Sequence, residues 1–472
     1  MDTARSHFVL RSRLDVPAAA AFAWHTRPGA FERLSPPWDR VRVVERSGNG
    51  VEDGARLVLE IRKGPARQRW VAVHSGYEPG RRFVDTQESG PFATWQHTHT
   101  VEPDGADACT LEDSIAYSLP GGALGSALGG PLARRTLERM FAFRHMRTRD
   151  DLARHAAYAD RPRLRVGVTG ASGLVGSALV PFLTTGGHEV VPIRRSGATG
   201  APGWAVAGVA ALDGLDAVVH LAGEPIAQRW SPAVKERILT SRVDGTRALV
   251  AALAARPRPP RTLVSASAIG FYGDRADEEL DEASAAGSGF LAEVCAGWEA
   301  AAASAATAAG VTSAAGVTTA ASAATAGPRV VTARLGVVLS PGGGALARLL
   351  PAFRAGAGGP VGSGRQWVSW IGLDDAVGAL HHLLQHDELS GPVTVVAPEA
   401  VRNRDLARTL GRVVRRPALL PLPAPAVAAA FGELGRATLL ASQRVLPRRL
   451  LESGFAFLAP DLDSALRREL GR

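Results

Sequence analysis

The chain has 472 residues, which is more than one ordinary domain holds and enough for two or three domains with their own cores. A hydrophobic fraction of 46% and a charged fraction of 21% are typical of a soluble globular protein. The net charge of +9 comes from scattered arginines without an aromatic-interleaved basic stripe, which argues against nucleic-acid binding. Two cysteines, Cys109 and Cys295, cannot form a disulfide framework and favour a cytoplasmic protein.

No segment predicts export or a membrane span. The first residues carry charges throughout and lack the apolar core of a signal peptide. The longest uncharged run, 300–328, consists of Ala, Ser, Thr and Gly with a few Val, so it is too weakly apolar for a bilayer. Its low complexity and imperfect AAGVT repeat instead predict a mobile surface insertion, to which we assign no function.

Residues 1–158 predict an α+β domain. The segment 18–34 has a helical pattern up to a Pro-Gly break, and 132–158 has the apolar spacing of a long amphipathic helix. Six segments between them have period-two or β-rich patterns: 40–45, 56–62, 69–77, 82–87, 95–102 and 109–119. A curved antiparallel sheet with a long C-terminal helix is a helix-grip arrangement, which typically encloses an apolar cavity. We therefore expect an apolar ligand in this domain.

A short polar linker, 159–165, leads to a second domain at 166–400. Its apolar strands alternate with helices, which predicts an α/β fold with a doubly wound parallel sheet. The expected strands are 165–170, 189–194, 217–223, 261–268, 329–339 and 393–398. The remaining residues, 401–472, are rich in Arg, Leu and Pro and predict a small helical appendage on the substrate side.

A glycine-rich loop follows the first strand of the second domain. Gly170, Gly173 and Gly176 lie between that strand and an expected helix. In this setting glycines permit a tight turn and a close approach to a pyrophosphate, and a helix N-terminus favours its negative charge. The predicted cofactor-binding residues around this loop and a second strand end are Gly170, Ser172, Gly173, Leu174, Val175, Gly176, Leu221, Ala222, Gly223 and Glu224.

The next strand ends in two arginines. NAD-preferring sites place an acid about twenty residues past the glycine loop to bind the ribose 2′-hydroxyl. Here that position carries Arg194 and Arg195, whose guanidinium groups suit a 2′-phosphate. The sequence therefore predicts NADP(H) rather than NAD as the cofactor.

Longer stretches resemble known families. The glycine loop resembles the extended short-chain dehydrogenase/reductase superfamily, as do HLAG, SASAIGFYG and WIGLDDAV at 220–223, 265–273 and 370–377. Four further segments are similar to its nucleoside-diphosphate-sugar epimerase-like, NADP-binding branch: 223–250, 363–371, 391–403 and 441–457. Segments 22–38 and 90–101 resemble the START/polyketide-cyclase-like (SRPBCC) domain that some members carry. The resemblance implies a Rossmann fold, bound NADP(H) and a small-molecule substrate.

The usual catalytic pair of this superfamily is absent. Its reductases use a tyrosine as general acid/base and a lysine four residues later that lowers the tyrosine pKa. The chain has four tyrosines, and none has a lysine at that spacing. In the helix expected at 290–301, Cys295 stands at the tyrosine position and Glu299 at the lysine position. A carboxylate would raise rather than lower the pKa of a neighbouring acid, and Cys295 is better interpreted as a core residue.

Three other residues form a hypothetical rebuilt catalytic site. Ser267 ends a strand on the side where open α/β sheets bind substrates, and Tyr272 follows on the next loop. Lys235 comes from a third segment. Together they predict a Ser/Tyr/Lys set, and the alternative for Tyr272 is a packed loop aromatic.

Other polar pairs have simpler interpretations. His97 and His99 share one face of a strand, but no third ligand is in view, so we expect a solvated or cavity-lining pair and no metal. Asp374 and Asp375 are explained by a helix N-cap. Glu224 either contacts ribose or substrate or caps a loop.

Three functions are compatible with these features. The leading hypothesis is an NADP(H)-dependent oxidoreductase or epimerase-like enzyme joined to an apolar-ligand domain. The alternatives are a non-catalytic NADP(H) sensor, and a lipid or polyketide carrier whose Rossmann half is a scaffold. The sequence names no substrate, and it leaves open a homodimer of the kind that many relatives of this fold form.

Overall fold

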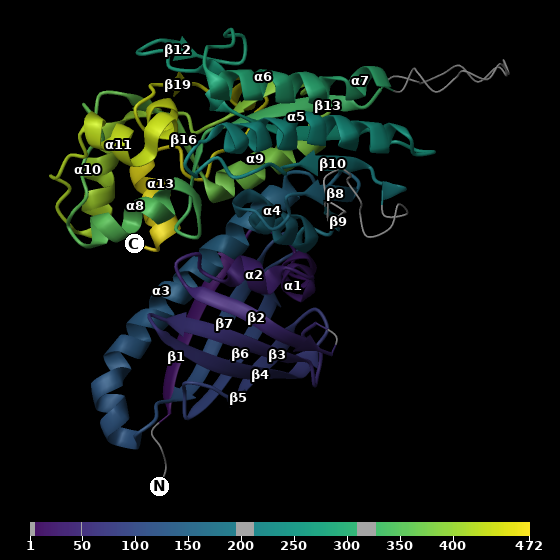
Figure 1. The fold of residues 1–472 in the computed structure, drawn as a ribbon. Helices are drawn as coiled ribbons and strands as arrows, with labels where there is room; N and C mark the ends of the chain where they lie inside the picture. Colours follow the sequence, from purple (N-terminus) through teal and green to yellow (C-terminus); the bar gives the residue numbers. More distant parts are fainter. Residues whose placement is uncertain (1–4, 49, 195–211, 309–326) are drawn as a thin grey trace, which may run out of the picture. The chain divides into compact units, whose positions relative to one another are not determined.

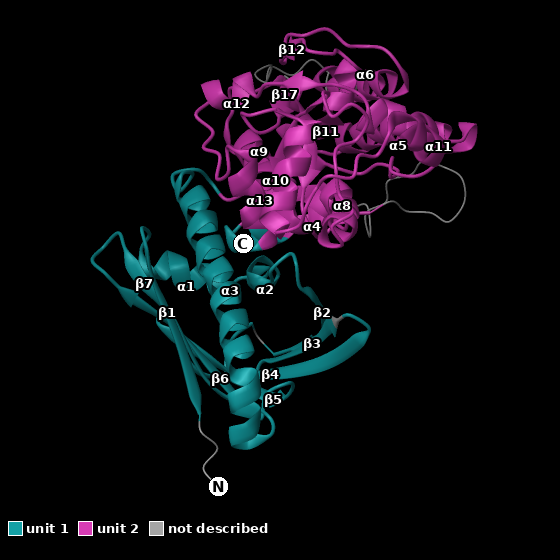
Figure 2. Ribbon diagram, turned by 90° about the vertical axis from the view of Figure 1, so that its left-hand side faces the viewer, with its two compact units in different colours: residues 1–162, 181–187, 471 teal, residues 163–180, 188–470, 472 magenta. Residues whose placement is uncertain are grey.

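A computed structural model describes residues 5–48, 50–194, 212–308 and 327–472 (Figure 1). Figure 2 distinguishes two compact units: residues 1–162, 181–187 and 471 form the first, and residues 163–180, 188–470 and 472 form the second. Among the described residues, no helix combines the length and the apolar character that a bilayer span requires.

The first unit has an antiparallel sheet and a long helix. The described strands follow the order β1-β7-β6-β5-β4-β3-β2 across the sheet. Their bounds are β1 Ser6–Leu14, β2 Arg40–Ser47, β3 Arg56–Lys63, β4 Ala66–Glu78, β5 Arg82–Ser89, β6 Thr94–Pro103 and β7 Cys109–Ser118. The helices are α1 Ala18–Thr26, α2 Ala30–Leu34 and α3 Gly122–Ala156. Figure 2 shows α3 running along the open side of the curved sheet, where it packs against β1 and β7.

The second unit has a parallel sheet in which the described strands follow the order β17-β13-β11-β10-β8-β9. Their bounds are β8 Arg165–Thr169, β9 Glu189–Ile193, β10 Ala217–His220, β11 Thr262–Ala268, β13 Arg329–Leu335 and β17 Gly391–Val395. Three pairs of short strands lie outside this sheet: β12 Glu279–Leu280 with β19 Arg444–Val445, β14 Val337–Leu339 with β16 Trp370–Gly372, and β15 Trp367–Val368 with β18 Val401–Arg402.

Helices connect these strands, and α6 and α9 both pack against the central strand β11. The helices between the strands of the parallel sheet are α4 Leu174–Thr185, α5 Pro232–Ala254, η2 Ile269–Tyr272, α6 Phe290–Ala303, α7 Ala305–Ala308, α8 Gly344–Arg354 and α9 Leu373–Gln385. The C-terminal ones are α10 Asn403–Val414, α11 Ala424–Leu434, η3 Gly435–Leu439, α12 Arg448–Glu452 and α13 Leu462–Leu470. An apolar core joins α8, α10 and α13 to β14 and β16.

The predicted fold class is confirmed, with two differences in the first unit. The edge strand β1 was not predicted, although its inward residues alternate with exposed ones. The long helix begins at Gly122, ten residues before its expected start. The first part of this helix has leucines at four-residue spacing, and all three are exposed: Leu124, Leu128 and Leu132. Glycines and Pro131 interrupt the helical pattern there.

The candidate cofactor site

The strand order reverses direction between β8 and β10. The chain passes from β8 to its neighbour β9 on one side and then crosses to β10 on the other side. Open α/β sheets bind ligands outside the carboxyl ends of the strands at such a switch point. Thr169 and His220 end these two strands opposite each other, so the glycine loop and the loop from Leu221 to Glu224 begin side by side. The topology therefore brings the two predicted cofactor loops together.

Two of the three glycines of the loop have a steric reason to be glycine. Gly170 has a φ of +66°, and a Cβ there would lie 2.8 Å from the backbone carbon of Leu221. A Cβ on Gly176 would lie 2.2 Å from the carbonyl oxygen of Gly170. Gly173 is exposed, and its Cβ would lie 3.2 Å from that same oxygen. Gly170 and Gly176 therefore keep the loop tight, whereas the exposed Gly173 leaves its outer face open to a ligand.

A series of buried hydrogen bonds fixes the positions of the two loops relative to each other. The Thr169 hydroxyl oxygen accepts from the backbone N–H groups of Leu221 (3.0 Å) and Ala222 (3.2 Å). It therefore donates its own proton to His220 Nδ1, 2.7 Å away, and His220 Nε2 donates to the Thr246 hydroxyl at 2.9 Å. Burial and, secondarily, the charge of Arg242 lower the pKa of His220 to about 3, so the ring is neutral. Neither Thr169 nor His220 was among the cofactor-binding residues predicted from the sequence.

The loop after β10 is fixed by the helix that follows it. Glu224 is half-buried, its backbone N–H donates to the Ser241 hydroxyl, and its carboxylate accepts from Gln228. Arg242 donates to the Glu224 carbonyl oxygen at 3.0 Å and lies 5.1 Å from the centre of the Trp298 ring. Glu224 thus has structural partners within its own loop and the N-terminal half of α5.

Of the two predicted 2′-phosphate ligands, Arg194 directly follows β9 and is exposed. Arg195 lies outside the described residues. Ser172 is exposed on the glycine loop, while Leu174 and Val175 open α4 and are half-buried.

The predicted catalytic serine belongs to a buried ionic network. The Ser267 hydroxyl donates to Glu299 Oε1 at 2.6 Å. Arg334 binds the same carboxylate with two hydrogen bonds of 2.9 and 2.8 Å and also donates to the Tyr272 hydroxyl at 3.0 Å. Its guanidinium lies 3.5 Å from the centre of the Phe271 ring. Burial opposes the charge of Arg334, but the hydrogen bonds to Glu299 outweigh it and raise its pKa. A charged residue inside an apolar parallel strand was the signal that could have revealed Arg334.

Tyr272 and Lys235 have separate sets of partners. Tyr272 is fully buried, and its hydroxyl donates to the Asp281 carbonyl oxygen at 2.7 Å. Burial raises its pKa to about 12, although the nearby Arg334 acts in the opposite direction. Lys235 lies on α5, where its ammonium pairs with Glu433 at 2.8 Å and lies over the Phe290 ring. Tyr272 thus belongs to the same hydrogen-bond network as Ser267, whereas Lys235 has a separate set of contacts.

Cys295 is a free, buried thiol of α6. Burial and then the charge of Glu299 raise its pKa to about 11. Cys109 is also free and buried, so the described cysteines form no disulfide.

The structure contradicts the N-cap interpretation of Asp374 and Asp375 and the solvated alternative for His97 and His99. The N-cap residue of α9 is Gly372 rather than an aspartate. In the first turn of this helix, the Leu373 N–H donates to Glu469. Asp375 instead accepts from the backbone N–H groups of Leu458 and Ala459. His97 and His99 are buried rather than solvated, and a third candidate ligand, Asp85, lies beside them.

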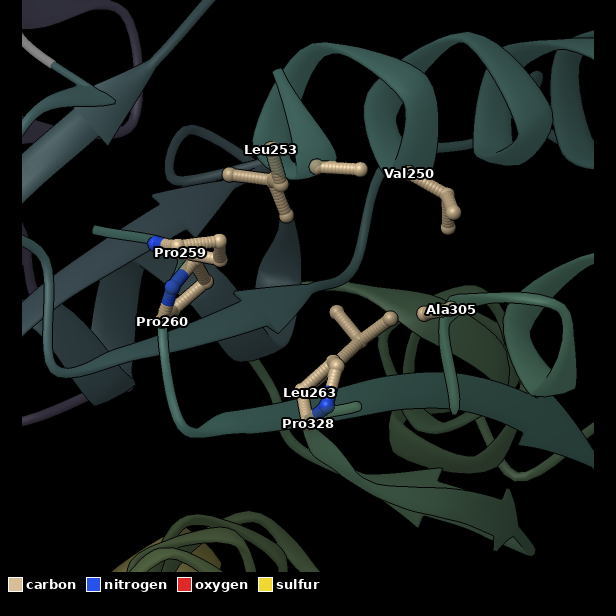
Figure 3. Close-up of a pocket in the computed structure, with 8 residues that line it drawn as sticks. Val250, Leu253, Pro259, Pro260, Leu263, Ala305 and Pro328 are labelled. Atoms are coloured by element: carbon tan, nitrogen blue, oxygen red, sulfur yellow. The ribbon is translucent and has the colours of Figure 1, made fainter. Parts of the chain in front are cut away.

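An apolar hollow lies at the opposite, amino end of β11 (Figure 3). Its lining includes Val250, Leu253, Leu263, Ala305, Pro259, Pro260 and Pro328. These side chains offer no acid, base or nucleophile, so the hollow does not compete with the switch point as a catalytic site.

Models of three families match the chain. The NAD dependent epimerase/dehydratase family matches residues 166–397, and the polyketide cyclase / dehydrase and lipid transport family matches residues 14–143. A domain of unknown function matches residues 422–469.

Curated relatives and solved structures agree with these matches. An epimerase family protein of Mycobacterium bovis is 42% identical over 308 residues, which are 64% of this chain and 96% of that protein. The human epimerase family protein SDR39U1 is 35% identical over 308 residues, 64% of this chain and 99% of its own. The nucleoside-diphosphate sugar epimerase from Corynebacterium glutamicum is 32% identical with a TM-score of 0.77, over 98% of this chain and 90% of that one.

A crystal structure of human SDR39U1 (isoform 2) was determined with NADPH. It is 34% identical with a TM-score of 0.55, and the match covers 64% of this chain and 98% of the human one. The glycine loop, the parallel sheet and these similarities lead to one conclusion: the chain belongs to the NAD-dependent epimerase/dehydratase family of the short-chain dehydrogenase/reductase superfamily, with a polyketide cyclase-like domain before its Rossmann sheet.

Proposed function

We propose that this chain is an NADP(H)-binding oxidoreductase or epimerase-like enzyme fused to a hydrophobic-ligand-binding domain. The observation that carries the proposal is the glycine loop at the switch point, where Gly170 and Gly176 permit contacts that a Cβ would block. The NADPH in the crystal structure of human SDR39U1 supports the choice of cofactor. The substrate is a small molecule that the geometry does not name.

The residues at the switch point fit a dinucleotide. The loop from Gly170 to Gly173 and the first N–H groups of α4 would hold the pyrophosphate, because a helix N-terminus favours negative charge. Arg194 would bind the 2′-phosphate from the end of β9, together with Arg195. The loop from Leu221 to Glu224 would hold the ribose side. When bound, NADP(H) supplies or accepts a hydride.

Ser267 is the strongest of the three predicted catalytic residues. It lies at the carboxyl end of β11, next to the switch-point strand β10, and its hydroxyl proton is directed to Glu299. Its oxygen can therefore accept a hydrogen bond from a substrate hydroxyl and orient it. Acid–base work by Tyr272 would require its hydroxyl to leave Asp281, and a pKa near 12 makes it a proton donor at neutral pH.

The first test is a titration of the cofactor-stripped protein with NADPH and NADH, followed by nicotinamide fluorescence. We expect tighter binding of NADPH, and we expect Arg194→Ala to reduce that preference. Arg258→Ala is the matched control, because Arg258 is an exposed arginine just before β11, at the amino edge of the same sheet. Equal affinity for the two cofactors in the unmodified protein, or equal effects of the two variants, would refute the assignment to NADP(H).

A non-catalytic NADP(H) sensor is the second candidate function. The structural partners of Tyr272 and Lys235 favour it, since neither group is directed toward a substrate by its contacts. A screen of carbonyl and hydroxyl substrates with deuterium-labelled NADPH separates the two functions. Transfer of deuterium to any substrate establishes an enzyme, whereas tight binding without transfer supports the sensor.

A further inference from the structure

A band of five titratable side chains crosses the interior of the first unit. Its members come from β5, β6, β7 and α3: Asp85, His97, His99, Asp113 and His145. Apolar clusters lie on both sides of the band along β6, with Trp95 in one cluster and Val101 in the other. A buried polar group is costly unless it is paired, so this band requires a physical explanation that apolar packing does not supply.

The strand register places these side chains together. Asp85 on β5 pairs with His97 on β6, and His99 pairs with Asp113 on β7. Because side chains two residues apart share one face of a strand, both imidazoles point to the same interior side. Their ring centres are 3.7 Å apart.

Three atoms on one side of the imidazoles form a donor set for a metal. Asp85 Oδ2 lies 3.0 Å from His97 Nδ1 and 3.3 Å from His99 Nε2. Ligands of a tetrahedral zinc ion, each bound at about 2.0–2.2 Å, lie about 3.3–3.5 Å from one another. The Trp95 indole donates to the other oxygen, Asp85 Oδ1, at 3.2 Å, which leaves Oδ2 directed at the two imidazoles.

The opposite nitrogens of the same two rings face a second carboxylate. Asp113 Oδ1 lies 2.9 Å from His97 Nε2 and 2.7 Å from His99 Nδ1. Asp113 Oδ2 accepts from His145 Nε2 at 2.8 Å, and the other nitrogen of His145 is 2.8 Å from the Ser12 hydroxyl. Metal-binding histidines almost always donate their second N–H to a carboxylate, carbonyl or water, which fixes the ring and its tautomer.

We propose that Asp85, His97 and His99 bind a divalent cation of the zinc class, with Asp113 as the carboxylate that orients both imidazoles. Two histidines and one carboxylate are a donor set of catalytic zinc sites, which keep a fourth position for water or a ligand oxygen. The side chain of Asp85 is 17% exposed, more than either histidine, so the open position lies on its side. This inference concerns the first unit and does not depend on the function proposed for the second.

The test uses the purified full-length chain, treated with a chelator and titrated with Zn²⁺ while bound metal is measured by mass spectrometry. We expect about one equivalent of tightly bound Zn²⁺ per chain and a higher melting temperature with the ion. Asp85→Asn and His99→Gln should abolish this binding, and Asp113→Asn should weaken it about 10- to 100-fold. His7→Gln is the matched control, because His7 is an exposed histidine of the same sheet and should bind Zn²⁺ like the unmodified protein.

Co²⁺ gives a readout that does not depend on whether the variants fold. The unmodified chain should show the visible absorption of tetrahedral Co²⁺, and Zn²⁺ should displace it. No absorption and no stoichiometric Zn²⁺, or equal Zn²⁺ binding in a folded His99→Gln variant, would overturn the proposal. The band would then be an ion-paired histidine–aspartate network.

Discussion

The sequence resemblance predicts that Glu299 stands at the position of the superfamily's usual lysine, and Glu299→Lys tests what it does here. The substitution removes a carboxylate that accepts from Ser267 and twice from Arg334, whose side chain is only 5% exposed. Removing one partner of a buried ion pair costs about 3–5 kcal/mol, and the new ammonium beside the guanidinium adds repulsion. We therefore expect Glu299→Lys to destabilise the second unit by at least about 3 kcal/mol.

Two further variants separate charge from shape. Glu299→Gln keeps the volume and one oxygen, so its cost should fall to about 1–3 kcal/mol. The double variant Glu299→Met/Arg334→Met removes both charges, and we expect it to be more stable than Glu299→Lys, because apolar replacements of a whole buried pair are often neutral.

The assay is urea denaturation monitored by hydrogen exchange of peptides from β11, α6 and β13. A local probe is needed because a chain of two units need not unfold in one transition. If Glu299→Lys unfolds at the same urea concentration as the unmodified protein, the buried pair is not what holds α6 to β13. A lysine at this position would then be tolerated, and the reasoning would fail.

Two predictions concern the glycine loop and the buried thiol. Gly176→Ala should cost about 1–3 kcal/mol in urea unfolding, because its Cβ meets the Gly170 carbonyl oxygen at 2.2 Å. Gly173→Ala should change the free energy of unfolding by less than about 0.5 kcal/mol, yet it should weaken NADPH binding roughly tenfold. An unchanged affinity for NADPH would mean that the pyrophosphate binds elsewhere. Because burial raises the pKa of Cys295 to about 11, only about 0.1% of this thiol should be thiolate at pH 8. Iodoacetamide should therefore label Cys295 in urea but not in the native chain. Rapid labelling of the native chain would contradict the burial of this thiol.

The sequence was most informative where the pattern is local. The alternation of apolar strands and helices predicted the parallel sheet, and period-two segments predicted β2 to β7. The glycine loop was recognisable because a strand, three glycines and a helix follow one another between Arg165 and Thr185. β1 was missed because only three of its nine residues are strongly apolar and inward, while charged residues alternate with them.

The polar networks could not be predicted, because their members are distant in sequence. Asp85 meets His97 only through the register of β5 and β6, and Asp113 and His145 come from two further elements. The sequence showed a histidine pair without a third ligand for that reason. Arg334 likewise meets Glu299 across the segment 309–326, which lies outside the described residues.

The network around Glu299 would limit where the proposed enzyme could carry out catalysis. Arg334 uses its guanidinium on Glu299 and Tyr272, and Tyr272 uses its hydroxyl on Asp281, so these three side chains connect α6, β13 and η2 through satisfied hydrogen bonds. Protonating or displacing any of them leaves a buried charge or donor without its partner, which costs free energy in every turnover. If the chain is the enzyme proposed above, its proton donor therefore has to come from outside this network. Ser267, at the carboxyl end of β11 next to β10, donates its own proton to Glu299 and so belongs to the same network.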